Sequence, residues 1–143
     1  MNIFEKTDAK SSEWIQDMMR CLRTDDDDQA LHALRAGLHA LRDRLTVDEA
    51  AQLSAQLPMT IRGLFFENWH PAGKPLRIRQ AREFLELVVG NYEPRSDAYA
   101  DDIIRAVFRV LVKHLKPGEI TGIMMSLPEP LLPVLGGRHR AQA

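Results

Sequence analysis

The stretch ALHALRAGLHALRDRL, residues 30–45, carries the strongest structural signal in this 143-residue chain. Its leucines recur every three or four residues, at positions 31, 34, 38, 41 and 45. This spacing places them in one stripe along a helix, because an α-helix completes a turn every 3.6 residues. We therefore predict a helix over residues 28–45, with Asp27 as its N-cap.

A second stretch, ADDIIRAVFRVLVKHL at residues 100–115, follows the same pattern 70 residues later. A shift of 70 aligns residues 9–65 with 79–135 without a gap and gives ten identities. The apolar matches are more persuasive than the identities, and include Trp14/Phe84, Met18/Val88, Leu34/Ile104, Leu38/Phe108 and Leu53/Ile123. Matched apolar positions are expected of two copies of one helical unit, so we predict an internal duplication.

Each copy predicts two further helices and a short fourth element. An earlier helix is expected over residues 10–23, with its counterpart over 77–91. The third helix starts at Thr46, where Glu49 completes a capping box; in the second copy Pro117 takes the first helical position. The fourth element follows Pro58 and Pro128, and further prolines make the second one irregular.

The predicted fold is all-α, because no alternating pattern typical of a strand persists beyond a few residues. We expect one domain of two tandem helical repeats, 9–65 and 79–135, related by a pseudo-twofold or by superhelical stacking. Residues 66–78 form the connecting loop, and residues 136–143 form a flexible tail. The helix at 98–115 is apolar on more than one face and is expected at the centre. The helix at 28–45 is expected to turn His32, His39, Arg42 and Asp43 outward.

Composition limits the class of protein. With 45% apolar and 27% charged residues, the chain can bury a core and does not resemble a disordered or membrane protein. The single cysteine, Cys21, excludes a disulfide framework and a cysteine-rich zinc site. The N-terminus lacks the pattern of a signal peptide, and the most apolar segment, 103–115, is too short and too charged to span a bilayer. We expect a soluble cytoplasmic protein.

The charge is unevenly divided along the chain. Residues 1–70 carry a formal charge of −4 and residues 71–143 carry +3, which gives the net charge of −1. A net charge near zero argues against a generally basic nucleic-acid binder. The two halves complement each other, so they can attract across an internal interface or present two different faces to partners.

Several motifs between residues 41 and 71 resemble one known family. They are the Leu-Arg-Asp-Arg-Leu to Glu-Ala-Ala-Gln-Leu run (41–53), the Gln-Leu-Pro at 56–58, and the Gly-Leu-Phe-Phe at 63–66 with Trp69 and Pro71. The chain resembles the bacterial family catalogued as domain of unknown function 2267 over about residues 10–135. The resemblance implies a small, mostly helical bacterial protein. It implies no catalytic residue and no cofactor, because the family carries no established activity.

The sequence offers no catalytic, cofactor-binding or metal-binding residues. His32 and His39 are two helical turns, ~10 Å, apart, which is too far to share a metal ion. Their counterparts are Asp102 and Arg109, which favours a solvated face. The acidic run 25–28 lacks the alternating ligands and the glycine of a calcium loop, and Cys21 has no identifiable histidine partner.

Two other patterns are interpreted structurally. The identities Arg35/Arg105 and Glu49/Glu119 suggest a repeated ion pair or cap within each unit, rather than two equivalent ligand sites. The junction at Leu45 could begin a helix-turn-helix, but the following helix, residues 47–57, offers no cation to DNA.

The connecting loop holds the best candidates for interaction. Asn68-Trp69-His70-Pro71 has no counterpart in the second copy, and a tryptophan beside proline is typical of interfaces. A basic strip follows it. The predicted interaction residues are Trp69, His70, Lys74, Arg77, Arg79 and Arg82. In the alternative interpretation, Trp69 folds back over the seam between the repeats and the basic strip is merely solvated.

These observations favour a non-enzymatic interaction or structural module with a protein partner. The alternative is nucleic-acid binding through the basic strip Lys74–Arg82. A third hypothesis is a small-molecule or catalytic site in a cleft between the copies. The chain is expected to be a monomer or a homodimer.

Overall fold

The computed structural model describes residues 3–92 and 100–133 of the chain. Within these ranges the protein is all-helical and contains no strand, as the sequence predicts. The helices are α1 (Ile3–Leu22), α2 (Asp27–Arg44), α3 (Val47–Ser54), α4 (Met59–Phe66), α5 (Ala81–Gly90), α6 (Ala100–His114) and α7 (Pro117–Met125), followed by the 3₁₀ turn η1 (Glu129–Leu131). The predicted tail, residues 136–143, lies outside the described residues.

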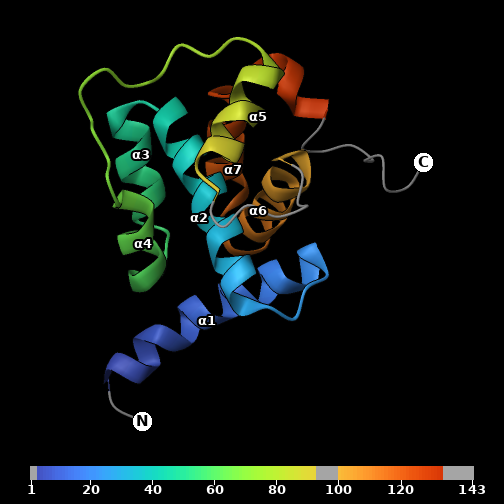
Figure 1. The fold of residues 1–143 in the computed structure, drawn as a ribbon. Helices are drawn as coiled ribbons and strands as arrows, with labels where there is room; N and C mark the ends of the chain where they lie inside the picture. Colours follow the sequence, from blue (N-terminus) through green and yellow to red (C-terminus); the bar gives the residue numbers. More distant parts are fainter. Residues whose placement is uncertain (1–2, 93–99, 134–143) are drawn as a thin grey trace.

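Helices α2 and α6 cross at the centre of the molecule (Figure 1). Helix α2 packs against α1, α4, α5 and α6, and α6 packs against α1, α2, α5 and α7. Their apolar side chains therefore meet neighbours on several sides, and one continuous core results. The largest buried side chains include Trp14, Met18, Leu34, Leu38, Leu41, Phe65, Phe84, Ile103 and Ile104.

The expectation that α6 is central is confirmed, but the expectation for α2 is wrong. His39 and Arg42 were expected to face solvent, and each is only 4% exposed. The physical reason is that α4 packs against this side of α2 and the connection after α4 folds back to its end. Both polar side chains find partners there, so their burial is compensated.

The contacts between helices come in matched pairs. Helix α1 packs on α2 and α6, and α5 packs on α6 and α2. Helices α2 and α6 end at positions 70 apart, and α3 and α7 begin at positions 70 apart. At the crossing, a Cβ atom added to Gly37 would lie 2.5 Å from Cγ2 of Val107, its equivalent position. A pseudo-twofold relation between two copies requires such a meeting, which supports the duplication; the duplication itself stays a prediction.

The local signals at the helix ends were mostly interpreted correctly. The capping box of Thr46 and Glu49 at the start of α3 is confirmed, and Pro117 opens α7 as predicted. The N-cap of α2 is Asp26 and not Asp27. Asp26 has the extended backbone of a cap, and its carboxylate accepts hydrogen bonds from the N–H groups of Asp28 and Gln29.

Candidate anion-binding groove

The connection between α4 and α5, residues 67–80, is tied onto the C-terminal end of α2. It crosses the top of the molecule in Figure 1. The backbone N–H of Leu76 donates to the carbonyl oxygen of Asp43 over 2.8 Å. Two residues later, Ile78 is 8% exposed and belongs to the core. These two anchors give the connection a defined position against α2, although it contains no regular secondary structure.

Side chains of α2 donate to carbonyl groups at the C-terminal end of α4, where the regular helical hydrogen bonds stop. Arg42 Nη1 donates to the carbonyl oxygens of Phe65 (2.9 Å) and Glu67 (2.7 Å). His39 Nε2 lies 2.7 Å from the carbonyl oxygen of Leu64. Because a carbonyl only accepts, the His39 proton sits on Nε2. The two buried side chains therefore act as a C-cap supplied by another helix.

Burial lowers the pKa of His39 below its ordinary value of 6.5. The hydrogen bond to Leu64 acts in the opposite direction, whereas the nearby positive charges of Arg42 and Arg35 lower the pKa further. His39 is consequently neutral at pH 7, which suits its position beside a buried arginine.

Trp69 is half buried rather than displayed on the surface. Its ring packs against Phe66 at a centroid distance of 5.2 Å, and Phe66 packs edge-on against Phe65 in the core. Its Nε1 is buried without an acceptor among the described residues. His70, in contrast, is exposed. Trp69 therefore packs on Phe66 and the core, and both its covering of the seam between the repeats and its role in an interface stay predictions.

A groove of about 750 Å³ lies where this connection meets the end of α2. Four of its lining residues are cations, and none is an acid. The lining consists of Arg44, Gly73, Lys74, Pro75, Leu76, Arg77, Ile78 and Arg79. Four positive charges around one hollow produce a positive potential there, because field lines concentrate in a concave surface.

The anchoring residues alternate with the cations. Leu76 and Ile78 are partly or fully buried, whereas Arg77 and Arg79 are exposed. Residues two apart along a non-helical segment tend to project to the same side. The burial of Ile78 therefore holds both arginines toward solvent at the groove. Neither arginine forms an ion pair with any residue in the described ranges.

Among the four cations of the groove, Arg44 alone has a side-chain nitrogen that is buried without a partner in the part of the chain that the structure describes. Its Nε is buried and has no hydrogen-bond partner within residues 3–92 and 100–133. A buried donor without an acceptor costs about 1–3 kcal/mol. The positive charge of Arg44 contributes to the lowered pKa of Glu49. The two carboxylate oxygens of Glu49 accept hydrogen bonds from the Thr46 N–H (2.8 Å) and the Ser126 hydroxyl (2.6 Å). Glu49 therefore interacts with the charge of Arg44 without accepting a hydrogen bond from its Nε.

The structure divides the predicted basic strip. It brings Lys74, Arg77 and Arg79 together in the groove. Arg82 lies on α5, where it lines a different and mainly apolar hollow. Arg44 completes the groove and was missed as a site residue. Nothing in the sequence shows that the segment 73–79 folds back to the end of α2, where Arg44 lies.

The repeated polar identities do not form repeated pairs. Arg35 pairs with Glu67 (2.8 Å), whereas Arg105 pairs with Asp101 and Asp102 of its own helix. The expectation of a cap is confirmed for Glu49, which completes the Thr46 box. Two equivalent ligand sites do not arise, because the two arginines lie in different surroundings.

A second polar cluster joins α1 to α6. The buried carboxylate of Asp17 accepts hydrogen bonds from His114 Nε2 (2.7 Å) and Lys113 Nζ (2.8 Å), and also contacts Arg20. The His114 ring stacks on Trp14 at 4.8 Å. Burial raises the pKa of Asp17, but the hydrogen bonds from Lys113 and His114 outweigh it and hold the pKa below 3.8. The cluster holds α1 against α6 through a contact between Asp17 and His114, which are 97 positions apart in the chain.

We expect Asp17→Asn to lower the free energy of unfolding by about 2 kcal/mol at pH 7. The substitution removes the negative charge that His114 and Lys113 contact. The loss stays moderate because Lys113 can turn to solvent. A carboxylate with a lowered pKa stabilises the folded state above its unfolded pKa of 3.8, and this contribution disappears as the pH falls through the folded pKa. Urea unfolding at pH 7 and pH 3 should therefore show the variant and the wild type converging at low pH. An unchanged difference would contradict this assignment.

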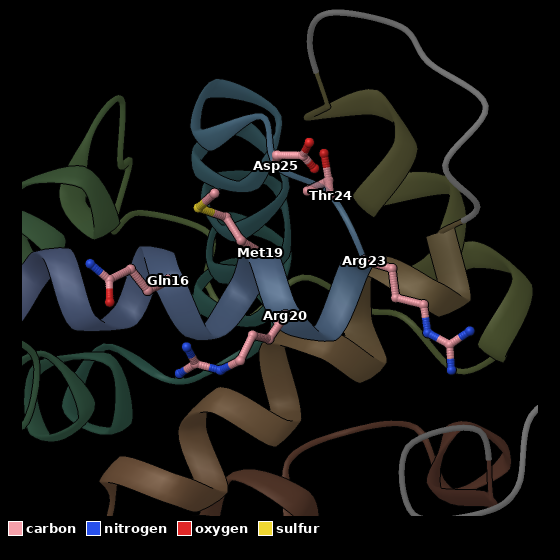
Figure 2. A pocket seen from close by; sticks show the side chains of 6 residues that line it. All are labelled: Gln16, Met19, Arg20, Arg23, Thr24 and Asp25. Carbon is pink, nitrogen blue, oxygen red and sulfur yellow. The ribbon is translucent and has the colours of Figure 1, made fainter.

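Other polar features are less suited to ligands. Burial raises the pKa of the half-buried Cys21 thiol, with Arg109 opposing, so the thiol is a poor nucleophile. Figure 2 shows a pocket at the corner between α1 and α2. Thr24 and Asp25 lie on one side of α1 there, whereas Arg20 extends from the other. These polar groups do not converge on one point, which a specific binding site requires.

The described part of the chain holds neither a metal-binding cluster nor a membrane-spanning helix. No three or more histidine, cysteine or acidic side chains there are placed to hold a metal ion. No helix of residues 3–92 and 100–133 is long and apolar enough to cross a membrane.

Fold and groove together define a small all-helical protein with a basic surface groove. The family described as "Uncharacterized conserved protein (DUF2267)" matches residues 11–134, so the chain belongs to this family. This confirms the family resemblance seen in the sequence. No curated protein matches the chain.

Proposed function

We propose that this chain is a non-enzymatic interaction module that docks an acidic segment of a protein partner in the groove. The observation that carries the proposal is the set of four cations, Arg44, Lys74, Arg77 and Arg79, around one hollow without a lining carboxylate. A positive groove accelerates and orients the docking of an acidic surface.

The types of residue in the groove support binding rather than catalysis. Its lining consists of arginine, lysine, glycine, proline, leucine and isoleucine. Apart from the amine of Lys74, none of the lining residues offers a side-chain group for nucleophilic or acid–base chemistry. The lining also has no aromatic ring on which a base could stack, which favours a protein partner over a single-stranded nucleic acid.

A matched pair of double variants tests the proposal. We expect Arg77→Glu, Arg79→Glu to weaken the binding of a fluorescent Asp/Glu-rich dodecapeptide at least about tenfold, because each reversal replaces attraction by repulsion. Arg82→Glu, Arg109→Glu changes the net charge equally but at exposed positions outside the groove. Fluorescence anisotropy at low and high salt measures both affinities.

The control variant should bind almost as the wild type does, and added salt should weaken wild-type binding. Equal losses in the two double variants would show a general charge effect and refute the groove. No peptide binding at low salt would refute docking of acidic segments. Tighter binding of a 12-base-pair DNA duplex, lost in the groove variant alone, would instead establish the nucleic-acid alternative.

A further inference from the structure

We infer that the groove recognises a phosphoryl group, carried by a phosphorylated side chain of the partner segment. This inference rests on the proposed function and adds the chemical class of the group that is bound. It is carried by the juxtaposition of Arg44 with the anchored cations of residues 74–79.

The first step concerns the geometry of Arg44. A guanidinium presents its donors in a rigid fork, and its Nε and one Nη can bind two oxygens of the same anion side-on. The Nε of Arg44 is shielded from water and has no acceptor in the described part of the chain. Rotation of the Arg44 side chain toward the groove would let a phosphoryl oxygen, docked side-on, supply that acceptor. Lysine, which carries a point charge, cannot make this paired contact.

The second step concerns the opposite wall. Arg77 and Arg79 are held by the burial of Ile78 between them, and the Leu76 N–H bond to Asp43 ties this wall to the helix that carries Arg44. The two walls are therefore fixed relative to each other before a ligand arrives. Such preorganisation lowers the entropy lost on binding.

The third step concerns charge. A phosphoryl group on a side chain carries close to two negative charges at pH 7 and has three strong acceptor oxygens. A carboxylate carries one charge and two oxygens. Three arginines and one lysine around one hollow offer more donors and more charge than a single carboxylate can use. The groove is also larger than a phosphate ion needs, so peptide flanking the phosphoryl group has room to lie in it.

Four labelled dodecapeptides test the inference by fluorescence anisotropy. They share one neutral sequence and carry, at the centre, phosphoserine, the pair Asp-Asp, a single Glu, or Ser. We expect the phosphoserine peptide to bind on the order of tenfold tighter than the Asp-Asp peptide of similar charge. Inorganic phosphate should compete with the phosphopeptide.

Arg44→Lys separates geometry from charge, since it keeps the positive charge and removes the fork. We expect it to abolish the preference for phosphoserine over Asp-Asp while leaving the affinity for Asp-Asp unchanged. Far-UV circular dichroism checks that the variant is folded. In the wild type, the Arg44 Nε–H signal, assigned by its loss in Arg44→Lys, should shift in ¹H–¹⁵N NMR spectra when phosphate is added.

The possible failures are distinguishable. If Asp-Asp and phosphoserine peptides bind equally, the phosphoryl inference is overturned and the docking of acidic segments stands. If an Arg44→Lys variant that folds normally keeps the preference, Arg44 does not read the phosphoryl group and the inference is overturned. If a phosphorylated single strand of DNA binds more tightly than the phosphopeptide, the group comes from nucleic acid and the inference is also overturned. If no anionic peptide binds at low salt, both proposals fail.

Discussion

Arg42→Ala should lower the free energy of unfolding by about 3 kcal/mol. Arg42 is 4% exposed, and its guanidinium bridges the carbonyl oxygens of Phe65 and Glu67 while pairing with Asp43. The substitution leaves these acceptors without their donor and opens a cavity beside α4. Each buried acceptor that loses its partner costs about 1–3 kcal/mol, and the partly exposed Glu67 carbonyl regains water. Urea unfolding followed by circular dichroism measures the loss.

Arg35→Ala is the matched control, because Arg35 lies on the same helix and pairs with the side chain of Glu67. Both partners of this pair are substantially exposed, so its loss should cost at most about 1 kcal/mol. If the two variants lost equal stability, Arg42 would not be the buried cap of α4. Because Arg42 also holds the start of the connection that forms the groove, Arg42→Ala should weaken binding of the acidic peptide as well.

Gly37→Val should destabilise the fold by about 3 kcal/mol through overpacking. A Cβ atom at this position would lie 2.5 Å from Cγ2 and 3.2 Å from Cβ of Val107. Valine is branched and stiff, so neither side chain can move aside and α2 and α6 must separate. The better helix propensity of valine recovers only a few tenths of a kcal/mol. The midpoint of urea unfolding reports the change.

Two further variants make this prediction specific. Gly63 also lies inside a helix, but a Cβ there meets nothing within 4 Å. Gly63→Ala should therefore stabilise the protein by about 0.5–1 kcal/mol. Adding Val107→Ala to Gly37→Val should recover part of the lost stability, because it removes the clashing methyl groups. A loss for Gly37→Val that Val107→Ala does not reduce would show that the crossing is not the cause.

The apolar pattern was sufficient to predict the helices and their buried faces, although α1 begins at Ile3 rather than at residue 10 and α5 at Ala81 rather than at residue 77. Leu34 and Ile104 are fully buried, and so are their neighbours one turn along each helix. The capping box at Thr46 was predicted equally well. These features depend on side chains within about four residues of one another, which a sequence displays directly. The N-cap of α2 was misplaced by one residue because four aspartates in a row offer the same chemistry.

The position of polar side chains was predicted less well. His39 and Arg42 were expected outside, since a polar residue on a helix normally faces water. They are buried because their acceptors, the carbonyl groups at the end of α4, lie 23 to 25 positions further along the chain. The Asp17–His114 contact joins residues 97 positions apart. No local pattern contains such partners.

The candidate site contains some residues that are close together in the chain and one that is distant. The sequence indicated Lys74, Arg77 and Arg79, because they are close together in the chain. It did not indicate Arg44, which the fold alone brings to the same groove. It grouped Arg82 with the strip, but α5 begins at Ala81 and carries this arginine to another hollow.

Local sequence patterns alone specify that this chain forms helices, where α3, α4 and α7 begin, and which apolar faces turn inward. Those properties follow from backbone hydrogen bonding and apolar spacing over a few residues. Which charges are buried, and which cations share a groove, depends on the packing of helices that are distant in the sequence. Burial of a charge is tolerated only where distant backbone or side-chain groups compensate it, and that depends on how the helices pack.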